Sequence, residues 1–208
     1  MKRYDITQEV FGCRVYPGDP SPKKEELASM AKGDLYNLTA FSMCAHNGTH
    51  IDAPRHFIAD GKTVDEISHE RMIGICYLAE HEGIVTKEAA EAILEKAAKC
   101  HPEAAKRILV KGNATLSYEG AEVFAKAGVF LYGNESQTVG PEEAPLKVHV
   151  LLLTNEVVLL EGVRLSHVPC GVYYLFAAPL LLGGADGAPC RAFLVQDEFL
   201  LHGKELLR

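Results

Sequence analysis

Apolar positions change their spacing several times along the chain, and each change predicts an element. Between Thr86 and Lys99 they recur at the helical period, with Thr86 placed to cap the first turn, so we expect an amphipathic helix. The short apolar run at 73–78 predicts a buried strand. Upstream, residues 23–30 predict a short helix, and residues 35–44 alternate as a strand that leads into a cluster of histidines.

A strand, a helix and a second strand follow one another in the middle of the chain. Residues 107–111 and 129–132 are apolar runs of strand length. The helix between them is expected to start after Ser117, a good N-cap, and to end at Ala127, next to Gly128. Such a crossover places its two strands in parallel.

The last third of the chain predicts two more strands, at 172–182 and 190–196, joined by a hairpin turn through Gly183 to Gly187. A phosphate-binding loop is the weaker interpretation of these glycines, because neither a P-loop lysine nor a helix follows them. We find no internal repeat and no linker. We therefore predict a single α/β domain over residues 1–208, built on a mixed sheet.

Composition and charge narrow the classes of function. The 208 residues are 48% hydrophobic and 24% charged, which is typical of globular proteins and not of disordered chains. A net charge of -7, without a cluster of lysine and arginine, argues against a nucleic-acid partner. The most apolar run, at 148–160, is interrupted by Thr154-Asn155-Glu156, so we expect no membrane span.

The N-terminal residues and the cysteines both favour a cytoplasmic location. Met1 to Asp5 lead directly into a strand-like segment, without the apolar core of a signal peptide. The six cysteines lie far apart and form no C-x-x-C pair, which favours reduced thiols over disulfides. Cys44 shares the parity of the nearby histidines, so a thiolate ligand there is an alternative to a buried structural cysteine.

Three histidines and an aspartate lie within residues 46–56, and their nitrogen and oxygen donors suit a divalent metal ion. In an extended strand, side chains two apart share a face, which would group His46, His50 and Asp52. Gly48, between the two histidines, would leave room for the ion. A helix would instead turn Asp52 away. We therefore predict that His46, His50 and Asp52 bind metal.

Two further donors, His149 and Glu161, flank the apolar run and lie six residues on either side of Asn155. A reversal at Thr154-Asn155 would fold them toward each other. An imidazole and a carboxylate in apolar surroundings both need a partner, which a metal ion would supply. A His–Glu pair without metal and an exposed strand end are the alternatives.

Ligand counting favours two ions, because two four-coordinate ions need eight bonds. The bonds would come from His46, His50, His149 and Glu161, from a bridging Asp52, and from one shared hydroxide. Bound metal lowers the pKa of water from about 16 toward 7, so this hydroxide would be a nucleophile. His56, left over by the count, is predicted to transfer a proton to a leaving nitrogen, with a third-ligand role as the alternative.

The run His46-x-Gly-Thr-His50-x-Asp52-x-Pro54-x-His56 resembles the signature of the cyclase family of metal-dependent hydrolases, which includes bacterial kynurenine formamidase (arylformamidase) and isatin hydrolase. Four other segments are similar to conserved segments of the family and occur in the same order. They are Tyr16-Pro-Gly-Asp-Pro before the histidine run, and Val148-His149, Leu160-Glu161-Gly162 and residues 179–192 after it. The resemblance implies a swivelling β/β/α fold with a mixed sheet or flattened barrel. It also implies a homodimer or a larger homo-oligomer.

The resemblance implies the same site residues as the ligand count. One ion would bind His46, His50 and Asp52, with Asp52 shared, and a second would bind His149 and Glu161. His56 would be the proton-transfer residue. Two divalent ions are expected, zinc first and manganese as the alternative.

The leading hypothesis is a hydrolase of a non-peptide amide, such as the aryl formamide N-formylkynurenine or a cyclic amide. Tyr16 would stack on an aromatic substrate, although a role as a loop anchor is the alternative. Two other hypotheses stay open. One is a lyase or cyclase that uses the metals to stabilise an enolate, and the other is a non-catalytic metal-binding protein.

Overall fold

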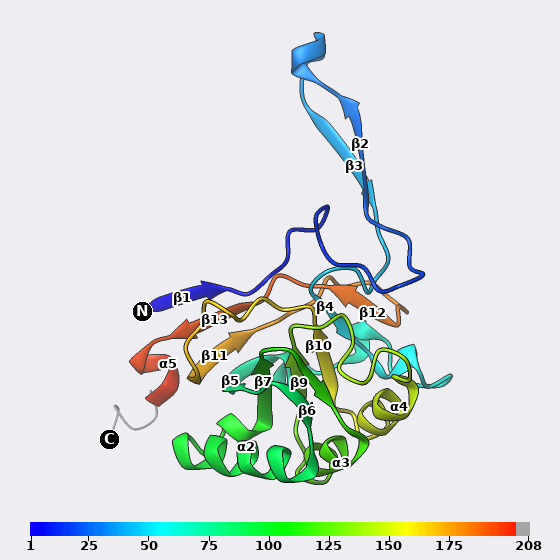
Figure 1. The fold of residues 1–208 in the computed structure, drawn as a ribbon. Coiled ribbons are helices and arrows are strands. Elements are labelled where there is room, and N and C mark those ends of the chain that lie inside the picture. The colour runs from blue at the N-terminus through cyan, green and yellow to red at the C-terminus, as the bar shows by residue number, and fades with distance from the viewer. Residues whose placement is uncertain (203–208) are drawn as a thin grey trace.

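The computed structural model describes residues 1–202, and these residues form one curled, nine-stranded sheet with helices against it (Figure 1). The strand order is β1 (Lys2–Asp5), β13 (Phe193–Gln196), β11 (Gly171–Phe176), β5 (Ile73–Glu80), β7 (Arg107–Lys111), β9 (Leu131–Asn134), β10 (Val158–Glu161), β4 (His50–Asp52) and β12 (Gly187–Pro189). Strands β5, β7, β9 and β10 are parallel, and the strands at both edges are antiparallel. The predicted mixed α/β sheet is confirmed.

Helices α2 (Lys87–Cys100), α3 (Tyr118–Lys126) and α4 (Leu146–Thr154) lie along one side of the sheet (Figure 1). The predicted caps are present, because the Thr86 hydroxyl accepts from the Ala89 amide at 3.3 Å and the Ser117 hydroxyl accepts from the Gly120 amide at 3.0 Å. Among the described residues, no helix is long and apolar enough to cross a membrane.

The remaining elements are short. They are helices α1 (His69–Met72) and α5 (Glu198–His202), the parallel pair β6 (Gly83–Val85) and β8 (Ala114–Leu116), and 3-10 turns at Met30–Lys32, Pro54–His56, Val64–Glu66 and Ala104–Lys106.

The central strands are buried on both faces, which explains their nearly continuous apolar sequences. Ile108 and Val110 of β7 pack on the helix side, where Phe124 of α3 belongs to the same cluster. Leu109, between them, faces the opposite cluster together with Leu160 of β10. This alternation decides which residues of the outer strands face the helices.

An arm formed by β2 (Lys23–Ala28) and β3 (Leu38–Ser42) projects from the body (Figure 1). The predicted helix over 23–30 is therefore wrong, and the predicted strand over 35–44 is shorter and pairs with β2 instead of joining the main sheet. Residues 23–27 are all exposed, so no buried face selects a helical period, and strand pairing overrides the local helix propensity.

The segment that follows β11 is also more complex than predicted. Strand β11 ends at Phe176, and Pro179 interrupts any continuation because proline cannot donate to a strand ladder. The chain then forms β12, the edge strand that pairs with β4, before it joins the other end of the same sheet as β13. The predicted hairpin turn through Gly183 to Gly187 is therefore wrong. This segment instead leads into β12, which lies beside the histidine-bearing strand β4.

Candidate active site

Strand β4 lies between β10 and β12 and presents His50 and Asp52 on the helix side of the sheet. Glu161 of β10 is the register partner of His50, and Gly187 of β12 is the partner of Asp52. His50, Asp52 and Glu161 are each exposed by 2% or less. Pairing between the two strands therefore brings both carboxylates and one imidazole together in a largely buried position.

His46 reaches this group from a turn and not from the strand. The extended conformation predicted from His46 onward begins only at His50, and Gly48 has a φ of 67° in the left-handed region. The His46 Nδ1 nevertheless lies 2.9 Å from Asp52 Oδ1. A Cβ on Gly187 would lie 2.6 Å from the His46 ring, so the ring packs against bare backbone.

Gly48 has a different role from the one predicted. A side chain there would meet the Cβ of Cys13 at 3.0 Å, so this glycine does not leave space for an ion. It supplies the left-handed turn between the two histidines.

The predicted reversal at Thr154-Asn155 is confirmed, with a helix on one side of it and a strand on the other. His149 on α4 places Nε2 3.2 Å from Oε1 of Glu161 and 3.8 Å from Oδ2 of Asp52. The Val139 amide donates to the same Glu161 oxygen at 2.8 Å. His149 therefore joins the buried group from the helix layer.

Backbone carbonyls orient two of the imidazoles. His50 Nδ1 donates to the Gly48 carbonyl at 3.0 Å, and His149 Nδ1 donates to the Pro145 carbonyl at 2.9 Å. In the neutral form of each ring, this hydrogen on Nδ1 would leave the lone pair on Nε2. Both Nε2 atoms face the carboxylates, which is the arrangement of histidines that ligate a metal.

Side-chain amides and a hydroxyl tie the histidine loop to the end of β10. Gln137 Nε2 donates to the Gly48 carbonyl at 2.9 Å. The Thr49 hydroxyl and Gln8 Nε2 donate to the Gly162 carbonyl at 2.8 and 2.6 Å. The sequence analysis did not single out Gln8 or Gln137, because an isolated glutamine carries no recognisable pattern.

A second carboxylate, Asp186, contacts the outer histidines. Its Oδ2 lies 2.9 Å from His46 Nε2 and 3.2 Å from His56 Nδ1, and the two rings are stacked with centroids 3.9 Å apart. Asp186 was not predicted as a site residue, because it lies in the glycine-rich segment interpreted as a turn. The one feature of the sequence that could have indicated it is that Asp186 is the single charged residue between Gly183 and Gly187.

The buried charged groups shift one another's pKa values. Burial works to lower the pKa of His50, but hydrogen bonds and charge from Asp52 and Glu161 raise it to about 10. Burial likewise works against the charged form of His149, and the Glu161 carboxylate raises its pKa. Burial works to raise the pKa of Asp52, yet the histidines around it hold that pKa well below its usual range. Without a metal, protons on the imidazoles balance the carboxylates.

The outer histidines differ from each other. Burial works to lower the pKa of His46, but Asp52 and Asp186 raise it overall. Burial lowers the pKa of His56, and the nearby Asp52 and Asp186 charges only partly oppose this. The His56 ring is therefore mainly neutral at pH 7.

A cavity of about 480 Å³ opens onto these residues. Tyr16, Phe57 and Thr138 line it together with His46, His56 and Asp186. The Tyr16 hydroxyl donates to the Glu142 carbonyl at 3.0 Å, which fixes the ring at the wall. The cavity is thus lined by aromatic side chains as well as by the polar cluster, and the centroid of the Phe57 ring lies 4.8 Å from that of His149.

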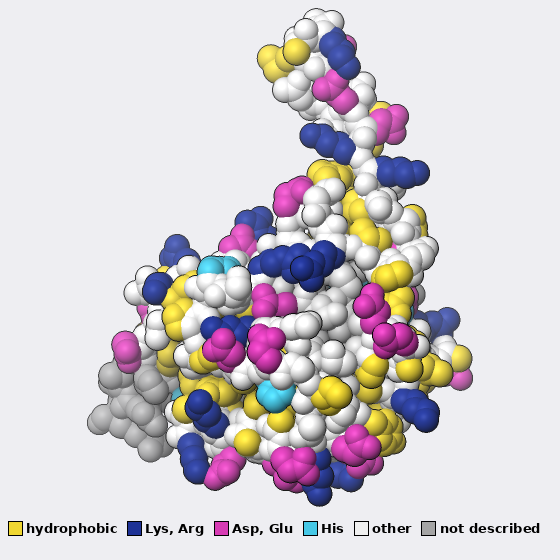
Figure 2. All heavy atoms as spheres, viewed as in Figure 1, with side chains coloured by type: hydrophobic (Ala, Val, Ile, Leu, Met, Phe, Trp, Pro, Cys, Tyr) yellow, Lys and Arg dark blue, Asp and Glu magenta, His cyan; other side chains and the backbone are white. Residues whose placement is uncertain are grey.

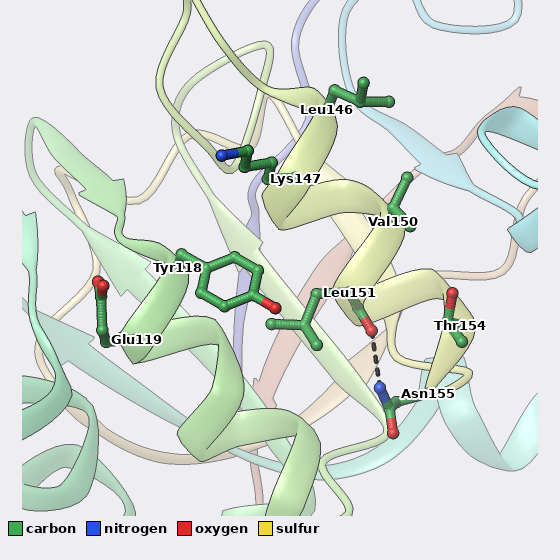
Figure 3. Close-up of a pocket in the computed structure, with 8 residues that line it drawn as sticks. All are labelled: Tyr118, Glu119, Leu146, Lys147, Val150, Leu151, Thr154 and Asn155. Carbon is green, nitrogen blue, oxygen red and sulfur yellow. Dashed lines mark hydrogen bonds between the residues drawn. The ribbon is translucent and has the colours of Figure 1, made fainter.

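A larger hollow of about 790 Å³ lies between α3 and α4 (Figure 3). Tyr118, Leu146, Val150 and Leu151 line it with other α3 and α4 residues, and no histidine belongs to its described lining. It is on the other face of α4 from His149.

The donor set fits a divalent metal ion. Three groups have ligand atoms within 4.8 Å of one another, and they are His46, His50 and Asp52; Asp52, His149 and Glu161; and His46, His56 and Asp186. Imidazole nitrogens and carboxylate oxygens are common ligands of such ions, and Asp52 belongs to two of the groups. Buried carboxylates also need positive charge nearby.

Comparisons with known proteins agree with this geometry. Residues 4–141 match the sequence model of the family described as "Putative cyclase". The kynurenine formamidase of Bacillus anthracis is 34% identical over 210 residues, covering 93% of this chain and 97% of that protein.

The chain belongs to the cyclase family.

Solved structures extend the likeness. A "predicted metal-dependent hydrolase from Bacillus stearothermophilus" is 27% identical with a TM-score of 0.75, covering 93% of this chain and 97% of that one. Isatin hydrolase A from Ralstonia solanacearum is 20% identical, has a TM-score of 0.77, covers 94% and 92% of the two chains, and shows the shared fold. The predicted cyclase-family fold is confirmed.

Proposed function

We propose that this chain is a metal-dependent hydrolase of a non-peptide amide, either an aryl formamide such as N-formylkynurenine or a cyclic amide. The observation that carries the proposal is the convergence of His46, His50, Asp52, His149 and Glu161 beside an open cavity. The likeness to a kynurenine formamidase over nearly the whole chain supports the same chemistry. An open cavity also favours catalysis over a structural metal site, which would be closed by protein ligands.

Two divalent ions fit the donor set best, with zinc as the first choice and manganese as the second. His46, His50 and Asp52 would hold one ion, and His149 and Glu161 would hold the other with Asp52 shared. When bound, ions of this kind activate water and polarise a carbonyl.

His56 is the proposed proton-transfer residue. Its ring lines the cavity, with a side chain 27% exposed, and it stacks on His46. Because burial lowers its pKa, the ring is neutral at pH 7 and can accept a proton and then pass it to the leaving nitrogen. The position at the rim gives access to both substrate and solvent.

Tyr16 is the proposed aromatic contact for the substrate. It lines the cavity with Phe57, and its hydrogen bond to the Glu142 carbonyl holds it there. Thr138 also lines the cavity, and its hydroxyl oxygen is buried without a hydrogen-bond partner among the described residues.

We also propose a homodimer, and the arm supports it. The arm exposes apolar side chains, among them Leu35 at 92% and Met30 at 60%, and Figure 2 shows hydrophobic groups at its tip and near its base. An isolated two-stranded hairpin is marginally stable in water, so a second copy would stabilise it.

A cytoplasmic location and a single domain complete the proposal. The location is supported by six free cysteines, and the single domain by one sheet with strands from Lys2 to Gln196.

The test is activity of the zinc- or manganese-loaded protein on N-formylkynurenine, isatin and simple lactones. We expect amide hydrolysis that stops on chelation and falls about 10²- to 10⁴-fold in His56→Ala, while His69→Ala, on the exposed surface, keeps full activity. Reaction in ¹⁸O-water separates a hydrolase from a lyase or cyclase, because only hydrolysis places solvent oxygen in the product. Turnover that survives chelation, or that His56→Ala leaves undiminished, would refute the mechanism.

A further inference from the structure

One oxygen of Asp186 lies within hydrogen-bond distance of two different imidazoles. Its Oδ2 lies 2.9 Å from Nε2 of His46 and 3.2 Å from Nδ1 of His56. An ionised carboxylate has no hydrogen to donate, so it can only accept hydrogen bonds. Both of the facing nitrogens must therefore carry hydrogen.

For His56, this contact decides which nitrogen can take part in proton transfer. A hydrogen on Nδ1 leaves the lone pair of the neutral ring on Nε2. Aspartate plays the same part when it fixes the tautomer of a general-base histidine in hydrolases. In His56, Nε2 is then the acceptor, and Asp186 never has to exchange the proton itself.

For His46, the same contact decides which nitrogen would meet the metal. A hydrogen on Nε2 leaves the Nδ1 lone pair directed at Asp52 Oδ1, 2.9 Å away. Two lone pairs facing each other are unfavourable unless a positive charge lies with them, which a shared cation supplies. His46 would thus bind through Nδ1, whereas His50 and His149 face the carboxylates with Nε2.

The backbone around Asp186 is suited to hold it in place. The Ala53 amide, one residue after Asp52, donates to the Asp186 carbonyl at 2.9 Å, and the Val64 amide donates to the Ala185 carbonyl at 2.9 Å. Gly187 then pairs with Asp52 in the sheet. Asp186 is therefore anchored to the same strand as the proposed ligands, although its side chain is 46% exposed.

We propose that Asp186 is a positioning residue that sets the tautomers of His46 and His56 together, with Nε2 hydrogen on His46 and Nδ1 hydrogen on His56. The consequence for catalysis and the tautomer of His46 rest on the proposed function and its metal, but the tautomer of His56 does not. One carboxylate thereby couples a metal ligand to the proton-transfer residue.

The experiment is ¹⁵N NMR of ring-labelled histidine, which distinguishes the two tautomers of each ring, in zinc-loaded and metal-free protein. Signals are assigned from His46→Ala and His56→Ala. In the loaded protein we expect hydrogen on Nε2 of His46 and on Nδ1 of His50, His56 and His149. In Asp186→Ala we expect His56 to become a mixture of tautomers, with a loss of about 10- to 100-fold in kcat or zinc affinity.

Asp65→Ala is the matched control. The Asp65 carboxylate accepts from the Gly184 amide at 3.0 Å, so this variant loosens the same segment and leaves Asp186 present. It should leave the His46 and His56 tautomers unchanged. The proposal is overturned if His56 keeps its Nδ1 hydrogen in Asp186→Ala, if Asp65→Ala shifts it equally, or if loaded His46 carries hydrogen on Nδ1.

The spectra are independent of turnover. If the wild-type protein hydrolyses none of the amides but Asp186→Ala still changes the His56 tautomer, the proposed function fails and the positioning role stands. If hydrolysis is found while the tautomers ignore Asp186, the positioning role fails alone.

Discussion

The site has an inner and an outer group that differ in how they are held. The inner group consists of His50, Asp52, His149 and Glu161, and the outer group consists of His46, His56 and Asp186. Inner side chains are at most 3% exposed, whereas the outer ones are 15%, 27% and 46% exposed. The inner residues come from β4, β10 and α4, and the outer ones come from turns and loops.

This difference matches two tasks that need opposite environments. Binding charge firmly is favoured by burial, because a low dielectric strengthens the attraction between a cation and carboxylates. Exchanging protons requires contact with solvent and freedom for a ring to adjust, which loops provide. His46 lies between the groups, since it contacts Asp52 on one side and Asp186 on the other.

The largest effect is expected from changing the inner group at Asp52. Asp52→Asn removes the charge shared by two of the donor groups, so bound metal should be lost and activity should fall by at least about 10³-fold, beyond the 10- to 100-fold typical of residues that only orient ligands. Metal content after dialysis and kcat are the measurements. Asp60→Asn, in an exposed turn, should change neither.

The contrast between the groups would fail if Asp52→Asn kept full metal content while His56→Ala lost it. The outer group would then hold the ions, and the inner carboxylates would serve only to balance protonated histidines.

The inner group and most of the outer group could be predicted from the sequence, for identifiable reasons. Asp52 and His50 share a parity, and the symmetry of His149 and Glu161 about Asn155 survives whether the flanking segment is helix or strand. The pairing of β12 with β4 is a long-range contact that no local pattern encodes, so Asp186 was missed. The turn at His46 was missed too, because the parity argument assumes an extended backbone and Gly48 instead adopts the left-handed conformation.

The arm shows the converse case. Local propensity over residues 23–28 favours a helix, but these residues pair with 38–42 and bury almost nothing in the described chain. Sequence periodicity reports a buried face, so it is uninformative where there is none.

A smaller effect concerns the pH dependence of metal binding, which separates the inner group from the outer group. The folded pKa of His50 is about 10, above its usual 6.5, so its stabilising charge is fully present below pH 6.5 and is lost as the pH rises through 10. Metal binding requires the neutral ring, so zinc binding at pH 8 should release at least about one proton per chain and should tighten as pH rises. Calorimetry in buffers of different ionisation enthalpy measures this release.

His56 supplies the matched comparison for that release. Because burial lowers its pKa, the His56 ring is neutral at pH 8 and has no second proton to lose, so His56→Ala should release as many protons as the wild type. A release that disappears in His56→Ala and persists in His50→Ala would assign the buried charge to the outer group instead.

The smallest effect is expected at Gly48, in the turn that separates the two groups. Alanine there must adopt a φ of 67°, which costs about 1–2 kcal/mol, and its Cβ would press on Cys13. For a chain of this length, Tm should fall by about 2–8 °C. Gly183→Ala is the control, because its φ is not in the left-handed region and the nearest atom to its added Cβ is 3.8 Å away. Strand pairing holds the backbone of His50, whereas the backbone of His46 lies in the turn, so Gly48→Ala should disturb the His46 tautomer before it disturbs that of His50. A loss of order at His50 first would show that the inner group depends on this turn as much as on the sheet.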